Sequence, residues 1–231
     1  EHVMQEGPLY QEGRRHLTAD VNACVDGCFA GGATEVLVRD AHGGHGSNLL
    51  WDQADPRAQY ALGNTGKRRY GAPVEDFNAV MLLGYHAMAG TPEAVMEHTM
   101  SSGHWQNFWL NDRRSGEIAA DAAIAGEHGV PVVLVTGDDK CCAEAEDFLP
   151  GVTTACVKWG SCCYGARMLS AEAAHDLIRE RAAEAVKNAG TVEPYVVAPP
   201  VVARLEKVSR SPLPDPEGKP YMRTIDGRTY E

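Results

Sequence analysis

The stretch Val132-Val133-Leu134-Val135-Thr136-Gly137-Asp138-Asp139 is a short apolar run that ends in two aspartates. Short runs rich in Val and Leu predict strands buried on both faces, which is how parallel sheets appear in sequence. Similar runs occupy residues 36–42, ending in His42, and residues 80–86, ending in His86. In open α/β sheets, ligands bind beyond the carboxyl ends of the strands. Two histidines and a pair of aspartates are therefore expected at the edge where such folds place their chemistry.

Helical patterns separate these apolar runs. A helix is expected from about residue 11 to residue 29, ended by Gly31-Gly32, where glycine adopts a left-handed backbone at little cost. Ser115 and Ser170 are expected to cap two further helices, because a serine side chain accepts a hydrogen bond from the first helical turn. Before Gly190 we also expect a short helix at residues 140–148 and two further strands, at residues 108–110 and 152–158. Because strands and helices alternate, we predict an α/β fold with a largely parallel or mixed central sheet flanked by helices.

The composition of the chain changes after Gly190. Residues 194–208 predict one or two strands interrupted by Pro199-Pro200, and residues 225–230 contain a hairpin turn at Asp226-Gly227. We therefore expect an α/β domain over residues 1–190. Residues 191–231 are expected to form a smaller β-containing portion, either a C-terminal extension or a partial second subdomain that is truncated in this sequence.

Charge and hydropathy exclude several classes of partner. The chain of 231 residues has a formal charge of −11, which argues against binding to nucleic acid or to an anionic membrane surface. Its apolar runs are all much shorter than the roughly 20 residues that cross a bilayer. The sequence opens without the basic and apolar pattern of a leader. A cytoplasmic location is expected.

The seven cysteines predict buried thiols rather than a metal or disulfide framework. Cys24 and Cys28 fall on the inward stripe of the first expected helix, where free cysteine behaves as a small hydrophobic residue. The adjacent pairs Cys141-Cys142 and Cys162-Cys163 match no zinc spacing with intervening residues. Reduced, structural cysteines are expected.

Four polar side chains near the strand ends are candidates for chemistry: His42, His86, His98 and Glu117. Histidine nitrogen and carboxylate oxygen are ordinary zinc ligands, and a zinc-bound water can reach a pKa near ~7. Each residue alone also fits a structural role, as a hydrogen-bonded loop histidine or as a carboxylate favoured by a helix dipole. Asp138-Asp139 alone fits the cap of the helix at 140–148, and His45 in the glycine-rich loop fits an exposed position.

Several motifs in one order resemble the zinc-dependent D-aminopeptidase family, from about Tyr10 to Leu177. They are Asp40-Ala41-His42 with Asn48-Leu49, Leu83-Gly84-Tyr85-His86-Ala87 followed by Met96-Glu97-His98-Thr99-Met100, Leu110-Asn111-Asp112 with Gly116-Glu117, and Val135-Thr136-Gly137-Asp138-Asp139. The resemblance implies a two-zinc aminopeptidase that acts on short peptides with a D-residue at the amino end. It also implies a homodecamer of two stacked five-membered rings with active sites facing an internal channel.

The resemblance assigns a role to each of the four candidates. His42, His86 and Glu117 are implied to be metal ligands, and His98 is implied to be the catalytic histidine beside the metals. The family also opens with a strand ending in Asp-x-Glu-Gly, whose two carboxylates complete the zinc pair. Glu6-Gly7 is only a faint echo of that element. We therefore expect an additional strand ahead of Glu1.

Two other functions remain open at this point. The same scaffold and metal could hydrolyse an L-peptide or another small amide, because the cysteine-rich blocks at 141–142 and 156–163 depart from ordinary family sequence. A chain that truly lacked the Asp-x-Glu-Gly element could instead be a metal-deficient, ring-forming binding or scaffold protein. The ordered set of histidines and Glu117 favours the enzymes.

Overall fold

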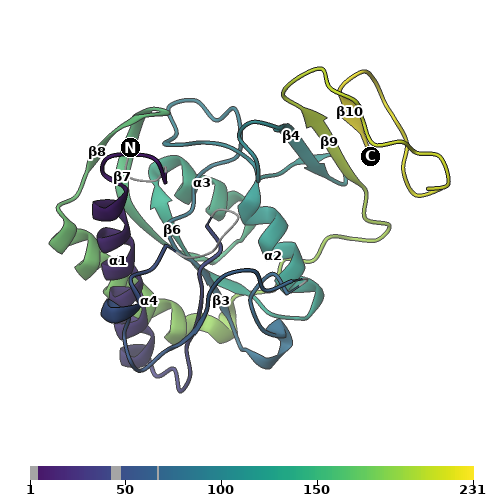
Figure 1. Ribbon diagram of the computed structural model, residues 1–231. Coiled ribbons are helices and arrows are strands. Elements are labelled where there is room, and N and C mark those ends of the chain that lie inside the picture. Colours follow the sequence, from purple (N-terminus) through teal and green to yellow (C-terminus); the bar gives the residue numbers. More distant parts are fainter. Residues whose placement is uncertain (1–4, 43–47, 67) are drawn as a thin grey trace.

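A four-stranded sheet in the order β3-β6-β7-β8 forms the centre of the fold. The computed structural model describes residues 5–42, 48–66 and 68–231 (Figure 1). Strands β3 (Val80–Leu82), β6 (Val132–Asp138) and β7 (Thr153–Cys162) run parallel, and β8 (Gly165–Met168) returns antiparallel to β7. The predicted strand at 132–136 is therefore confirmed as the middle of a mixed sheet.

Helices cover both faces of this sheet. Helices α1 (Tyr10–Gly31) and α4 (Ala171–Asn188) pack with Val133 and Leu134 of β6 in one apolar cluster. Helices α2 (Glu117–Glu127) and α3 (Asp139–Phe148) pack with Val132 and Val135 in a second cluster on the other face. Every residue of β6 is buried, as expected for a strand between two helical layers. The predicted α/β class is confirmed.

The predicted first helix is confirmed and packs closely on α4. It ends at Gly31 and is capped by Gly32, whose φ of 105° is the left-handed backbone expected there. Cys24 and Cys28 are buried on its inward side, as expected. At Gly27 the two helices approach so closely that a Cβ atom would lie 2.3 Å from the carbonyl oxygen of Arg179. The close contact between α1 and α4 therefore depends on the absence of a side chain at position 27.

Strand β1 (Leu37–Arg39) lies outside the central sheet. Among the described residues it pairs only with β2 (Gln59–Ala61), in parallel. The strand expected over 34–40 is thus shorter than predicted, and β2 falls in a mixed polar stretch where no element was predicted. Short 3-10 helices at Trp51–Gln53 and Val74–Asp76 complete this region.

A third sheet, in the order β10-β9-β4-β5, lies at the side of the molecule where the chain ends (Figure 1). Strand β4 (Trp105–Leu110) contains the predicted strand at 108–110, turns through Asn111 and Asp112 into β5 (Arg113–Arg114), and pairs antiparallel with β9 (Ala203–Lys207). A 3-10 turn, Ala189–Thr191, follows α4. Strand β10 (Thr229–Tyr230) follows the predicted turn at Asp226-Gly227 and pairs with β9. The division into two domains stays a prediction.

Three capping predictions have different outcomes. Ser170 caps α4, accepting a hydrogen bond from the main chain of Ala173 at 3.2 Å. Asp138 caps α3 in the same way. The prediction for Ser115 was wrong: Gly116 is the N-cap of α2, and the Ser115 hydroxyl donates to the carbonyl oxygen of Arg113 at 2.9 Å. The hairpin return strand β8 was also not predicted. None of the helices in the described part of the chain is long and apolar enough to span a membrane.

Glu144 of α3 carries a buried carboxyl group that lies beside Met88 and Gly116. One of its oxygens, Oε2, accepts the main-chain N–H of Met88 at 2.7 Å. The other, Oε1, has no hydrogen-bond partner among the described residues. Burial raises the pKa of Glu144 to about 7, because the carboxylate form loses hydration without full compensation.

Replacing Gly27 with alanine should destabilise the fold. Alanine by itself favours a helix by about 1 kcal/mol over glycine, but its Cβ would lie 2.3 Å from the carbonyl oxygen of Arg179 and 2.8 Å from Cβ of Ala182. We expect Gly27→Ala to lower the free energy of unfolding by about 2 kcal/mol, measured by urea denaturation. Gly190→Ala is the control, because a Cβ there meets nothing within 4 Å. Equal midpoints for both variants would contradict this packing.

Glu144→Gln should change the pH dependence of stability. The folded chain holds a proton on Glu144 up to about pH 7, whereas the unfolded carboxyl loses it near its usual 4.5. Stability therefore falls as pH rises between these values, by on the order of 3 kcal/mol in full. Glutamine cannot ionise, so the variant should gain stability relative to wild type between pH 5 and pH 8. Urea denaturation of the chelator-treated protein measures this.

The matched control for that experiment is Glu146→Gln, which changes an exposed carboxylate on the same helix. It should leave the pH dependence of unfolding as in wild type. If the free energies of unfolding of Glu144→Gln and wild type differ by the same amount at pH 5 and at pH 8, Glu144 ionises normally in the folded chain.

Candidate metal centre

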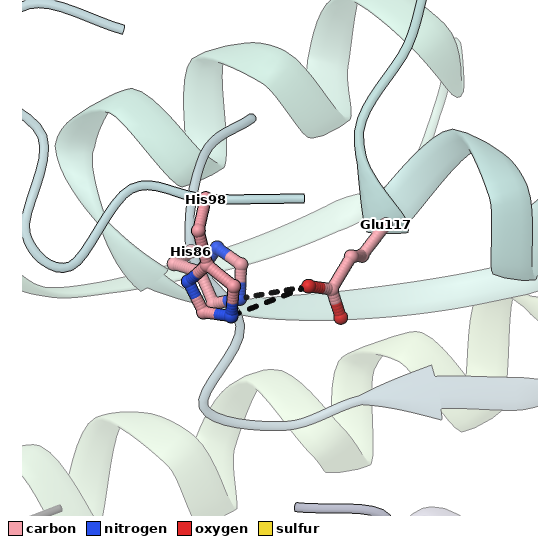
Figure 2. Close-up of side chains that lie close together, drawn as sticks. All are labelled: His86, His98 and Glu117. Atoms are coloured by element: carbon pink, nitrogen blue, oxygen red, sulfur yellow. Dashed lines mark ion pairs between the residues drawn. The ribbon is translucent and has the colours of Figure 1, made fainter. Parts of the chain in front are cut away.

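Three of the four candidate side chains, His86, His98 and Glu117, meet in one cluster (Figure 2). His86 lies four residues beyond β3, and Glu117 is the first residue of α2. His98 lies in a connection that we call the His98 segment, residues 88–101. One possible ligand atom from each residue lies within 4.8 Å of the others. The side chains are 18%, 26% and 14% exposed, so solvent reaches a largely enclosed site.

The distances in the cluster fit the donor set of a zinc ion. Oε1 of Glu117 lies 3.4 Å from Nε2 of His86 and 3.5 Å from Nε2 of His98. Ligand atoms about 2.1 Å from a zinc ion, arranged as a tetrahedron, lie about 3.4 Å apart. Imidazole nitrogen and carboxylate oxygen are also the ligand types that zinc takes in proteins. The spacing of His86 and Glu117 therefore fits two ligands of this metal, and His98 lies beside them.

Main-chain carbonyl groups orient both imidazole rings. Nδ1 of His86 lies 3.0 Å from the carbonyl oxygen of Ala87, and Nδ1 of His98 lies 2.7 Å from that of Met96. A carbonyl oxygen only accepts, so in the neutral ring each Nδ1 carries the proton and each Nε2 keeps its lone pair. Figure 2 shows both Nε2 atoms facing Glu117. This arrangement prepares Nε2 for binding a metal or accepting a proton.

The two rings are stacked, with centroids 3.9 Å apart and planes inclined by 18°. The lone pair of an imidazole nitrogen lies in the plane of its ring, so the lone pairs of the two rings lie in two separate, nearly parallel planes. A single ion can therefore lie in the plane of only one ring. This geometry supports different roles for His86 and His98 rather than two equal ligands.

Glu117 and His86 shift each other's protonation. Burial alone would lower the pKa of His86, but the hydrogen bond and negative charge of Glu117 outweigh it and raise that pKa. Burial acts to raise the pKa of Glu117, and the contacts with His86 and with the amide of Met100 lower it overall. Glu117 is therefore held as a carboxylate, the form in which it can bind a cation.

Strand β6 holds in place the two residues that precede His86, Gly84 and Tyr85. The N–H of Gly84 donates to Oγ1 of Thr136 at 2.8 Å, and the N–H of Tyr85 donates to the carbonyl oxygen of Thr136 at 2.9 Å. A Cβ at Gly137 would lie 2.6 Å from the carbonyl oxygen of Tyr85. The segment that carries His86 thus passes directly against the end of β6.

Asp121 is a buried residue of this region that the sequence did not reveal. It lies one helical turn after Glu117 and is fully buried. Its carboxylate accepts two hydrogen bonds from Arg69, at 2.6 Å and 2.7 Å, and one from the hydroxyl of Tyr85 at 2.6 Å. An acidic residue on the apolar face of an alanine-rich helix was the available signal. Asp121 thereby anchors the residue that precedes His86.

The fourth candidate, His42, is exposed and is not part of this cluster in the described residues. Its carbonyl oxygen accepts a hydrogen bond from the Asn48 side chain at 2.8 Å, and Asn48 is held by the buried carboxylate of Asp40. His45 and its glycine-rich loop lie outside the described residues. The role of His42 as a metal ligand stays a prediction.

Comparisons with known proteins identify the relatives of the chain. A family model described as D-aminopeptidase matches residues 1–231. The D-aminopeptidase of Bacillus subtilis is 38% identical over 186 residues, which cover 80% of this chain and 67% of that protein. The solved structure of a Zn-dependent D-aminopeptidase, DppA from Bacillus subtilis, described as a self-compartmentalizing protease, superposes with a TM-score of 0.90 at 32% identity. That match covers 99% of this chain and 83% of the other. The family resemblance seen in the motifs is confirmed, and the chain belongs to the D-aminopeptidase family.

Proposed function

We propose that this chain is a zinc-dependent aminopeptidase that removes an N-terminal D-residue from short peptides. The observation that carries the proposal is the cluster of His86, His98 and Glu117, in which the donor atoms of His86 and Glu117 are spaced to bind zinc and His98 lies beside them. Family membership and the names of the two relatives favour this activity. They do not favour hydrolysis of an L-peptide or another small amide, nor a metal-deficient binding or scaffold protein.

His86, Glu117 and His42 would hold the metal. The in-plane lone pair at Nε2 of His86 and the carboxylate of Glu117 would supply two donors, and His42 is proposed as a third. When bound, zinc would polarise the peptide carbonyl group and lower the pKa of a water molecule at the site. Two ions per subunit are part of the proposal, and the second would need the carboxylates of the expected Asp-x-Glu-Gly strand.

His98 would act on protons rather than bind the ion. Its Nε2 keeps a lone pair beside Glu117, because its Nδ1 is held by the carbonyl oxygen of Met96. From this position it would accept a proton from the attacking water and deliver it to the nitrogen of the departing amine. Glu117, held as a carboxylate, would stabilise the imidazolium that forms in between.

The assembly is proposed from the solved relative. That protein is described as self-compartmentalizing, which requires copies that enclose a space. We propose a homo-oligomer for this chain and, from the family resemblance of its motifs, specifically a decamer of two five-membered rings. A cytoplasmic location stays a prediction.

Purified protein reconstituted with zinc should hydrolyse D-Ala dipeptides faster than L-Ala dipeptides. His98→Ala should lower kcat by about 10²–10⁴-fold, the usual range for losing an acid–base group, while bound zinc is retained. His86→Ala should lose both activity and bound zinc. Liberated alanine and zinc content, by amine assay and metal analysis, measure the two effects.

The outcomes separate the three functions. Equal or faster hydrolysis of L-Ala dipeptides would support the alternative substrate. Absence of zinc from the wild-type protein after reconstitution, with no hydrolysis of either peptide, would support the scaffold. Loss of zinc in His98→Ala would contradict the division of roles between the two histidines.

A further inference from the structure

We propose that Asp138 is a positioning residue for His98, because it fastens the His98 segment to the carboxyl end of β6. The proposal rests on the proposed function, in which His98 moves protons. Asp138 is the last residue of β6 and is 2% exposed. Its hydrogen bonds go to the main-chain amides of Val95 and Cys141 and not to His86, His98 or Glu117. It would therefore act on His98 through the main chain of the His98 segment.

The carboxylate of Asp138 joins two different elements. Oδ1 accepts the N–H of Cys141 at 2.7 Å and so caps α3. Oδ2 accepts the N–H of Val95 at 2.6 Å. A helix cap needs only one acceptor, and serine or asparagine can supply it. Among the described residues, the second oxygen accepts a hydrogen bond only from the His98 segment.

The His98 segment needs such a fastening because its backbone is strained. Glu93, Met96 and Met100 have φ values of 58°, 54° and 55°, in the left-handed region that side chains disfavour. Residues in sparsely populated regions are less stable by about 1–3 kcal/mol each, and they persist only where their surroundings hold them. Two of these residues flank His98. The position of its ring therefore depends on contacts made by the segment's main chain.

A short sequence of contacts leads from Asp138 to Nε2 of His98. Asp138 fixes the amide of Val95, and the next residue, Met96, donates its N–H to the carbonyl oxygen of Cys163 at 2.9 Å. The carbonyl oxygen of Met96 then holds Nδ1 of His98 at 2.7 Å. Displacement of Val95 would move the group that orients the ring.

The segment also lies directly on the sheet beside Asp138. A Cβ at Gly160 of β7 would lie 2.0 Å from the carbonyl oxygen of Glu93 and 3.3 Å from Oδ2 of Asp138. The main chain of the segment therefore passes over a position without a side chain, and the buried carboxylate stands next to it. The hydrogen bond from the N–H of Val95 is partly buried, and its acceptor, Asp138, is 2% exposed, so loss of that acceptor is unfavourable.

Asp138→Ser tests the proposal, because serine keeps the helix cap but cannot reach Val95. We expect kcat on a D-Ala dipeptide to fall about 10–100-fold, since a displacement near 1 Å at a reacting group has effects of that order. KM and zinc content should stay near wild type. In a His98→Ala background, Asp138→Ser should lower kcat no further. An unchanged kcat, or an equal loss in the His98→Ala background, would overturn the proposal.

Asp139→Asn is the matched control. The neighbouring carboxylate of Asp139 accepts the N–H of Gly160 at 3.0 Å and pairs with Lys140, but it makes no recorded hydrogen bond to the His98 segment. This variant should keep wild-type kcat. If Asp138→Ser fails to fold, Asp138→Asn replaces it, because asparagine also caps a helix and offers only one acceptor oxygen.

Amide hydrogen exchange of the metal-free full chain separates this proposal from the proposed function. Peptides that cover residues 95–100 should exchange faster in Asp138→Ser and as in wild type in Asp139→Asn. Faster exchange in a protein that hydrolyses no dipeptide would reject the proposed function and keep Asp138 as the fastening of the segment. Unchanged exchange would reject the fastening itself, whatever the activity.

Discussion

One carboxylate oxygen, Oε1 of Glu117, gathers three segments of the chain. It faces Nε2 of His86 and Nε2 of His98, and it also accepts the main-chain N–H of Met100 at 2.7 Å. His98 and Met100 belong to the His98 segment, and His86 follows β3, so the fold must bring the end of β3, the His98 segment and the start of α2 to one point. Like-charged imidazolium rings would repel each other in this stack, and the carboxylate balances the positive charge that either ring acquires.

Buried acids hold the surroundings of this point in place. Asp121 ties Arg69 and Tyr85 to α2, Asp138 ties the His98 segment to β6, and Glu144 ties Met88 to α3. Burying a carboxylate is unfavourable unless hydrogen bonds replace its hydration. Asp121 and Asp138 have their oxygens fully engaged, and they fix geometry without touching the cluster. One oxygen of Glu144 accepts no hydrogen bond from the described residues, and burial raises the pKa of this carboxyl group.

The sequence predicted the parts of the fold that depend on apolar periodicity. Strand β6, buried between two helical layers, was visible as an uninterrupted run of Val and Leu, and helix α1 was visible from its stripe and its closing glycines. Strands β2 and β8 were not, because each is short and is defined by pairing with a neighbour that periodicity does not identify. The prediction for Ser115 failed because its hydroxyl donates to the carbonyl oxygen of Arg113 in the same turn, and Gly116 is the N-cap instead.

The site was only partly predictable for the same physical reason. His86 follows the end of a strand and Glu117 begins a helix, so their proximity is a consequence of the α/β layout. His98 lies in a strained connection; the sequence indicated it as a candidate, and the family motif assigned it a role distinct from that of the metal ligands. Asp121 contacts Tyr85 and Arg69, which lie 36 and 52 residues away in the sequence. The second contact of Asp138 spans 43 residues. No local pattern encodes partners so far apart.

The central claim is that Glu117 and His86 hold a zinc ion beside His98. Diffraction at the zinc absorption edge from crystals grown with zinc tests it most directly. The account predicts an anomalous peak within about 2.0–2.2 Å of Nε2 of His86 and of a carboxylate oxygen of Glu117, with His98 beside the peak and not bonded to it. A peak bonded to neither His86 nor Glu117, or the absence of any peak at the cluster, would contradict it.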